Sequence, residues 1–474
     1  MQDPSIFVGE GLPVAFSSIS FLFYFLPLFF IIYYLIPARA KNVVLLAWSL
    51  FFYAWGEPRW ILLLLASILV TWLLGRAMRP EASAGRRGLL ILGLVFQLGL
   101  LIAVKYAGFF FGAFIDLPKL HLPLGVSFYT FHAISYLVDV YRQKTPPQKN
   151  LLRLGLYLAL FPKLVMGPIV PYHELEPALA QRTIDAQDVS DGCFRFTIGL
   201  AKKALLADAL AGLVTGIWGD LASLTVLSAW LGLIGYALQL YFDFSGYSDM
   251  AIGLGRMLGF RFPENFRYPY LCSSISDFWR RWHISLGSWF KEYLYFPLGG
   301  SRAGTLRTLR NLLLVWLATG LWHGASWNYV LWGLYFGVLI CLEKLLAPRF
   351  RAHPRKGLLA GLYRPVCLLL AVLGWVLFRA EDLPAAGRYF ACLFGGAAGA
   401  SAQARLYLHD FWPVLLLGAV GATPLCAKLA GRLGAKLQPG VRAAVQAVLV
   451  LALLACSTVW LLNGSFQSFV YFQF

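Results

Sequence analysis

Charged residues are scarce in this sequence. Asp, Glu, Lys and Arg together make up 13% of the 474 residues, whereas hydrophobic residues make up 59% and the mean hydropathy is +0.68. Soluble domains carry roughly 25% charged residues, so a soluble chain of this composition would have too little polar surface to present to water. The composition therefore excludes a soluble globular protein and indicates a protein that is integral to a membrane; with the apolar runs described below, we expect an all-α fold.

The motifs of several common enzyme classes are also missing. The sequence contains no GxSxG nucleophile elbow, no Walker loop and no HExxH pair, and the glycines of "GLGRMLG" (253–259) are wrongly spaced for dinucleotide binding. The seven cysteines are scattered without a CxxC pair, so we expect neither a disulfide framework nor a zinc site. We accordingly expect no bound metal and no resident cofactor.

Acidic residues are fewer than basic ones, 22 against 40, which gives a formal net charge of +18. In a membrane protein such an excess mostly sets topology and attracts anionic lipid, so we do not expect a nucleic-acid partner. Residues 1–17 contain no basic residue, whereas Arg39 and Lys41 follow the first apolar run and residues 76–87 are again basic. These charges predict that the N-terminus, with an extension over residues 1–14, lies outside the cytoplasm.

Apolar runs close to 20 residues long predict transmembrane helices. We expect about eleven of them, together with re-entrant and interfacial helices, in one polytopic domain over residues 15–474. Several runs are short or interrupted by Pro and Gly, and such segments survive in a membrane only where protein surrounds them. The candidate runs are 21–36, 42–55, 59–75, 88–104, 151–170, 193–216, 225–241, 311–323, 328–346, 357–377, 411–430 and 443–462.

Polar residues gather between about 121 and 330, which we take as the region of the functional site. Within it, "FPKLVMGPIVPY" (161–172) contains three prolines and cannot form one straight helix. Asp243 and Asp249 lie among aromatic residues, and we expect them to be structural carboxylates because an unpaired buried charge is costly. Their candidate partners are Arg256 and Arg261. Lys202 and Lys203 are expected at the inner membrane interface, with contact to the phosphates of a cosubstrate as the alternative.

The stretch 274–302 has the pattern of an amphipathic helix. Ser274 and Asp277 make a capping box, and one apolar face follows, formed by Phe278, Trp282, Leu286, Trp289 and Tyr293. Arg280, Arg281 and Lys291 fall away from that face, and a basic, Trp-rich helix is typical of a membrane interface. We favour an interfacial anchor for these three residues and keep the binding of a phosphate-bearing cosubstrate as the alternative. His283 lies beside the apolar face. Its position alone indicates a hydrogen-bonded interfacial histidine.

His323 in "GLWHGASWNYVLWG" (320–333) lies between two long apolar segments. An ionisable residue inside a membrane is a candidate for function, and a neutral imidazole is suited to general base catalysis. Asn328 and the indole N–H groups of Trp322 and Trp327 are candidates to orient the ring or to hold an oxyanion. The alternative is a packing histidine that is hydrogen-bonded to a neighbouring carbonyl.

Several of these stretches together resemble the membrane-bound O-acyltransferase family. The resemblance rests on "FWRRWHISLGSWFKEYLYFPLGGSR" (278–302), on "LWHGASWNYVLWG" (321–333), on "PLGVSFYTFHAISYLVDVYR" (123–142) and on "YFDFSGYSDMAIG" (241–253). Their order and spacing cover nearly the whole chain from about residue 15. Within the family the sequence is most similar to the bacterial alginate and polysaccharide O-acetyltransferase branch.

The resemblance implies a fold and a mechanism. It implies helices around a central funnel, with His323 at the position of the family's invariant histidine and His283 at a second polar position. It also implies a bacterial inner-membrane protein that receives an acyl group from a cytosolic thioester, acetyl-CoA or a carrier-bound thioester, as cosubstrate. The expected partner is an extracytoplasmic acetyltransferase of the SGNH type, alongside membrane lipid.

Three functions remain open from the sequence. The first is transfer of an acetyl group across the membrane for O-acetylation of an exported polysaccharide such as alginate. The second is transfer of D-alanine or another acyl group to a teichoic acid or lipid. The third, from a different class, is a transporter or flippase whose histidines relay protons.

Overall fold

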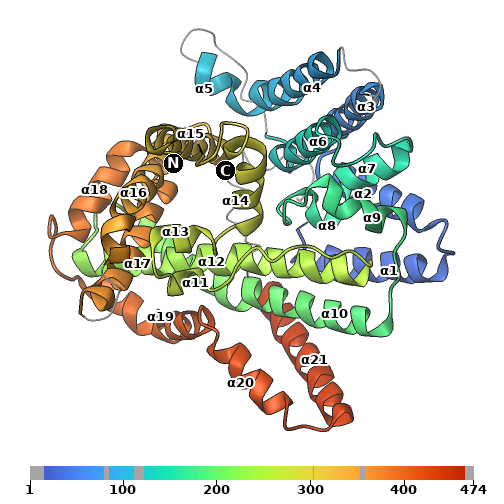
Figure 1. Ribbon diagram of the computed structural model, residues 1–474. Coiled ribbons are helices and arrows are strands. Elements are labelled where there is room, and N and C mark those ends of the chain that lie inside the picture. Colours follow the sequence, from blue (N-terminus) through green and yellow to red (C-terminus); the bar gives the residue numbers. More distant parts are fainter. Residues whose placement is uncertain (1–14, 79–84, 112–121, 303, 353–357, 465–474) are drawn as a thin grey trace. The chain divides into compact units, whose positions relative to one another are not determined.

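The computed structural model describes residues 15–78, 85–111, 122–302, 304–352 and 358–464, and every regular element in these ranges is a helix (Figure 1). The predicted all-α class is therefore confirmed for this part of the chain. The predicted N-terminal extension over residues 1–14 lies outside the described residues.

The chain divides into two compact units. Of the described residues, those up to 200, 247–263 and 458–464 form unit 1, and those in 201–246 and 264–457 form unit 2. The helix α12 (Val226–Met257) runs from unit 2 into unit 1. The expectation of a single polytopic domain over 15–474 stays a prediction.

Unit 1 is built around aromatic side chains and a long helix that is buried except at its last residue. The rings of Phe16 and Phe21 stack with their centroids 4.8 Å apart, and Phe29 lies 5.4 Å from Phe161. Every residue of α6 (Val126–Tyr141) from Val126 to Val140 is buried. The helices of this unit are α1 (Leu26–Leu35), α2 (Lys41–Gly56), α3 (Ile61–Ala77), α4 (Arg86–Leu101), α5 (Ala107–Phe111), α6, α7 (Leu151–Ala159), α8 (Phe161–Leu164), α9 (Tyr172–Ala180) and α10 (Ala186–Ala201).

Unit 2 contains a tightly packed pair, α15 (Thr305–His323) and α16 (Trp327–Ala352). They cross where two glycines meet, because a Cβ on Gly320 would lie 3.2 Å from the Cα of Gly333. This crossing fixes the C-terminal end of α15, at which His323 is the last residue. The other helices are α11 (Asp208–Trp218), α13 (Ile275–Trp279), α14 (Ile284–Phe290), α17 (Leu358–Arg379), α18 (Leu383–Leu393), α19 (Ala402–Gly421), α20 (Leu425–Gly434) and α21 (Pro439–Asn463).

Five helices in the described residues are long and apolar enough to cross a membrane. They are Arg86–Phe110, Val226–Met257, Trp327–Leu346, Gly361–Arg379 and Pro439–Asn463, and the bent pair α19 and α20 makes six if it counts as one span. The chain is therefore a multi-pass membrane protein, and the larger number of about eleven spans stays a prediction.

Three predicted runs have different boundaries from those expected. Residues 151–170 are not one helix, since α7 ends at Ala159 and α8 covers only Phe161–Leu164; the prolines of 161–172 interrupt it as predicted. The run 225–241 extends to Met257, and polar residues in the second half of α12 have protein partners, since Asp243 pairs with Lys203 and Asp249 with Arg195. The run 411–430 is broken near Pro424, where α20 bends by 66° from α19.

Candidate active site

A large cavity in unit 2 contains several of the residues singled out in the sequence. Its volume is about 1460 Å³, and residues of α13, α14, α15 and α16 line it. Arg280, His283 and Lys291 are among these residues, as are Glu343 and Lys344 of α16. The cavity therefore combines one imidazole with an excess of positive charge.

The expected amphipathic helix over 274–302 is wrong in one respect, because the chain breaks in its middle. Helix α13 ends at Trp279 and α14 begins at Ile284. Between them His283 has φ 45° and ψ 53°, a left-handed conformation that ends a helix. The backbone carbonyl of Asn265 accepts the N–H of Ile284 (3.0 Å), and its side-chain oxygen accepts the N–H (3.1 Å) and hydroxyl (2.9 Å) of Ser285.

The expected apolar face survives this break. Phe278, Trp282, Leu286, Trp289 and Tyr293 are all buried, with exposures from 0% to 8%. The expected cap is also present, since the Ser274 hydroxyl accepts the N–H of Asp277 at 3.0 Å. The Asp277 carboxylate does not close the reciprocal half of a capping box but accepts the N–H of Ser273 at 2.9 Å.

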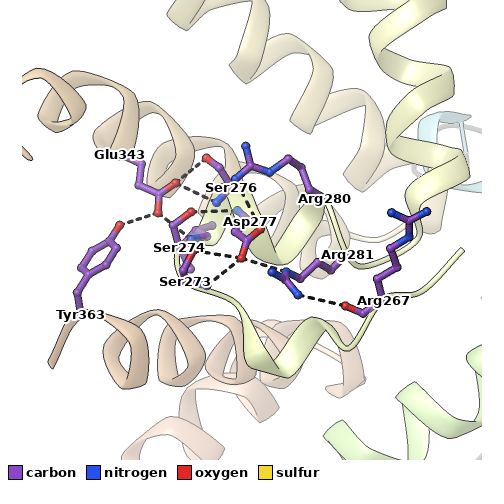
Figure 2. Close-up of polar contacts among 10 residues, drawn as sticks. Arg267, Ser273, Ser274, Ser276, Asp277, Arg280, Arg281, Glu343 and Tyr363 are labelled. Carbon is purple, nitrogen blue, oxygen red and sulfur yellow. Dashed lines mark hydrogen bonds and ion pairs between the residues drawn. The ribbon is translucent and has the colours of Figure 1, made fainter. Parts of the chain in front are cut away.

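Glu343 adds a second cap to α13 that the sequence did not indicate (Figure 2). Its carboxylate accepts the backbone N–H groups of Ile275 (2.7 Å) and Ser276 (2.9 Å) and the hydroxyl of Tyr363 (2.6 Å). An anion at a helix N-terminus is favourable. The Glu343 carboxylate, which lines the cavity, is thus bound to backbone N–H groups of α13. Because Glu343 belongs to α16, these bonds hold the two helices together.

The structure distinguishes the three basic residues for which an interfacial anchor was the favoured interpretation and phosphate binding the alternative. The side chain of Arg280 is 72% exposed and lies 3.6 Å from the Asp277 carboxylate, and Lys291 is exposed; both line the cavity. Arg281 forms a closer ion pair with Asp277 (3.0 Å) and is not among the lining residues (Figure 2). Burial would raise the pKa of Asp277, but the Ser273 N–H and Arg281 hold it below its usual value. Arg281 therefore has a structural partner, whereas Arg280 and Lys291 face the cavity.

His283 is a buried neutral imidazole in the cavity wall. It is 2% exposed, and its ring lies 4.6 Å from the ring of Phe244 and 6.0 Å from that of Trp322. Burial lowers the pKa of His283 to about 3, because a low-dielectric environment disfavours the charged form. The ring is consequently uncharged at neutral pH.

His323 lies in an aromatic cluster that the same tryptophan joins to His283. It is 5% exposed, and the rings of Trp322 (4.9 Å), Trp332 (4.9 Å) and Phe378 (5.2 Å) surround it. The Trp322 ring neighbours both imidazoles, so the structure places the two predicted catalytic residues beside one indole. Trp316 and Thr319, the two preceding turns of α15, line the cavity.

The three supporting residues occupy different environments. Trp322 is 5% exposed, and its ring lies 4.9 Å from that of His323; its supporting role stays a prediction. The amide of Asn328 instead donates to the carbonyl of Ala380 (2.6 Å) and fastens the start of α16 to the end of α17. Trp327 is 62% exposed. Sequence reasoning missed Trp332 and Phe378, although both lie in aromatic-rich stretches.

The other charged residues form pairs, but with partners different from those expected. The side chain of Lys203 is 1% exposed, and its Nζ lies 2.6 Å from the Asp208 carboxylate and 2.8 Å from that of Asp243. The expectation that Lys203 marks the inner interface is therefore wrong, because the side chain is buried in an ion-pair cluster. Asp249 pairs with Arg195, and the two arginines expected to pair with these aspartates, Arg256 and Arg261, bind Asp188.

Comparison with known proteins gives a consistent family assignment. The model of the membrane-bound O-acyltransferase family matches residues 142–360. The probable alginate O-acetylase AlgI of Pseudomonas aeruginosa is 43% identical over 395 residues, covering 80% of this chain and 75% of the relative. The peptidoglycan O-acetyltransferase of Helicobacter pylori is 36% identical over 413 residues, with 78% of each chain covered.

A more distant relative has a different acyl group in its name. The teichoic acid D-alanyltransferase of Bacillus subtilis is 29% identical over 248 residues, covering 48% of this chain and 62% of the relative. All three relatives are named as acyl-transfer proteins. The chain thus belongs to the membrane-bound O-acyltransferase family and is a membrane-embedded O-acyltransferase.

Proposed function

We propose that this protein takes an acetyl group from a cytosolic thioester, acetyl-CoA or a carrier-bound equivalent, and passes it across the inner membrane for O-acetylation of an exported polysaccharide such as alginate. Two relatives that match over three quarters or more of their length are named for O-acetylation of a cell-surface polymer, alginate in one and peptidoglycan in the other. The observation that carries the proposal is a pair of buried histidines on one tryptophan beside a large basic cavity.

The cavity is the proposed site of the donor. Pockets for drug-sized ligands measure roughly 300–1,000 Å³, so a volume of about 1460 Å³ has room for a long carrier arm as well as the acetyl group. Arg280, Lys291 and Lys344 line it and supply cationic groups for phosphate oxygens. The neutral ring of His283 then lies along the path of the thioester.

His323 is the proposed general base. A neutral imidazole takes the proton of the acceptor hydroxyl as the oxygen attacks the thioester carbonyl. The C–S bond then breaks, the thiolate leaves, and the imidazolium returns the proton to sulfur. Trp322 contacts both histidines, and we propose that its indole N–H stabilises the oxyanion. We expect His283 to position the thioester, so its loss should reduce transfer without abolishing it.

The final step needs an extracytoplasmic acceptor protein. We propose an SGNH-type acetyltransferase that passes the acetyl group to the polymer, since the donor is cytosolic and the polymer is exported. In this arrangement the N-terminus lies outside, as the basic residues of the early loops predict.

The test replaces His323 by alanine in cells that make the polymer. We expect O-acetyl esters on the polymer to be lost while the amount of protein in the membrane is unchanged. His409→Ala is the matched control, because this histidine has a side chain that is 83% exposed, in a pair with Asp410. Normal ester content in the His323→Ala strain would refute the assignment of the base.

The identity of the lost ester decides between acyl groups. Gene deletion followed by mass analysis of base-released acids should show loss of acetate from one polymer. Loss of D-alanine from a teichoic acid would instead favour the activity in the name of the Bacillus subtilis relative. Unchanged esters with altered transport would favour a transporter.

A further inference from the structure

Helix α20 has an exposed leucine face that no described part of the protein covers. None of its ten residues is buried, and Leu425, Leu429 and Leu433 are 49%, 47% and 64% exposed. At about 100° per residue these three leucines lie within about 80° of one another on one side of the helix. Ala427 and Gly431 lie on the opposite side, so the helix has one strongly apolar face and one of small residues.

Basic residues adjoin the leucine face. Residues 411–474 contain four basic residues and no acidic one, and all four fall within fifteen residues: Lys428, Arg432, Lys436 and Arg442. Lys428 and Arg432 lie on α20 beside the leucines, and Lys436 follows in the next turn, all exposed. Long basic side chains at such a border keep the charge in the headgroup layer while their stems lie on apolar surface.

The bend before α20 takes it out of the direction of a membrane span. α20 follows α19 at an angle of 66°, with a break at residues 422–424, and precedes the 25-residue apolar helix α21 (Figure 1). Only 6% of the apolar part of α21 is buried by protein. A short amphipathic helix between two apolar helices, turned away from the first, has the arrangement of a segment that lies along the membrane surface.

We propose that α20 is an interfacial helix that binds anionic phospholipid at the cytoplasmic leaflet. The leucines enter the acyl boundary, and Lys428, Arg432 and Lys436 bind lipid phosphates. Cytoplasmic loops are the ones that carry excess Lys and Arg, and the cytoplasmic leaflet holds anionic lipid. The proposal concerns a surface outside the acyl-transfer site and does not depend on the proposed function.

The first test uses the unsubstituted protein in lipid nanodiscs. Hydrogen–deuterium exchange of residues 425–434 should be slower in discs that contain phosphatidylglycerol than in discs of phosphatidylcholine alone. Each basic residue near an anionic surface changes the ratio of lipid-bound to released α20 about fivefold. Replacing Lys428, Arg432 and Lys436 by glutamine should therefore reduce the ratio by about 100-fold. The control removes three exposed basic residues elsewhere: Lys149→Gln, Arg388→Gln and Arg405→Gln.

The second test measures which face meets lipid. In a background with the other cysteines replaced by alanine, a fluorophore is attached to Cys426, beside the leucines, or to Gly431→Cys, on the opposite face. A Cβ on Gly431 meets no atom within 4 Å, so that variant fits. We expect lipid-attached quenchers to act on the Cys426 probe and iodide to act on the Gly431→Cys probe. Equal exchange in both lipids, or equal lipid quenching of both probes, would overturn the proposal.

Discussion

Replacing Gly320 by alanine tests whether the crossing of α15 and α16 positions His323. A Cβ at Gly320 would lie 2.3 Å from the carbonyl oxygen of Tyr329, whereas ordinary contacts begin at 3.4 Å. Because the opposing atom belongs to the backbone, no side-chain rotation relieves the overlap. The two helices must therefore separate by about 1 Å, since a close-packed interior has no space to absorb the methyl group.

Two effects on stability oppose each other in this variant. Alanine is favoured over glycine in a helix interior by about 1 kcal/mol, while overpacking costs typically ~1–3 kcal/mol. Because the backbone of α16 must move, we expect the upper part of that range and a net loss of about 1–2 kcal/mol. His323 follows three residues later, and a misplacement of about 1 Å can reduce a rate on the order of 100-fold.

The assay compares ester content of the polymer and thermal unfolding of the detergent-solubilised protein. Gly361→Ala in α17 is the matched control, because a Cβ there meets no atom within 4 Å. We expect the control to keep wild-type activity and to be equally or slightly more stable. If Gly320→Ala matched the control in both measurements, the crossing would not position the histidine.

Two further predictions concern the cavity wall. The pKa of His283 is lowered to about 3 from 6.5, so its contribution to stability is present above about pH 6.5 and is lost as the pH falls toward 3. The free energy of unfolding measured between pH 7 and 4 should fall more steeply in the wild type than in His283→Gln, by up to about 1.4 kcal/mol per pH unit; parallel curves would contradict the buried neutral state. Arg280→Gln and Lys291→Gln should each raise the KM for the donor about tenfold with little change in unfolding temperature, whereas Arg281→Gln should lower that temperature through Asp277 and leave KM unchanged. A raised KM in Arg281→Gln alone would place the donor on the other side of α13.

The features that could be predicted from the sequence are those with a local cause. The 3.6-residue period correctly identified the buried side of 274–302, because burial of Phe278 and Trp282 depends on a hydrophobic face that the sequence displays. The Ser274 cap was also predictable, since its partner lies three residues away. Prolines predicted the interruption of 161–172.

The features that could not be predicted depend on distant partners. The sequence makes Asn328 a candidate to orient the His323 ring or to hold an oxyanion. In the structure its side-chain amide donates a hydrogen bond to the carbonyl of Ala380, 52 residues away. Trp327 and Trp332 are five residues apart in one helix, yet only the contacts of that helix with its neighbours decide which ring lies against the histidine. The burial of Lys203 could not be predicted because one of its two carboxylate partners, Asp243, lies 40 residues away in the sequence.

The break at His283 depends both on the local sequence and on distant partners. Nothing in "RRWHISLG" predicts a helix end, and a left-handed conformation at a non-glycine residue costs about 1–2 kcal/mol. Contacts from outside the stretch offset that cost: Asn265 accepts three hydrogen bonds at the start of α14, and Glu343 caps the start of α13. Strained backbone that persists because its surroundings fix it is common at functional sites. The 3.6-residue helical period therefore fails at His283. The turn at this residue places its imidazole in the cavity wall, and a continuous helix would have no such turn.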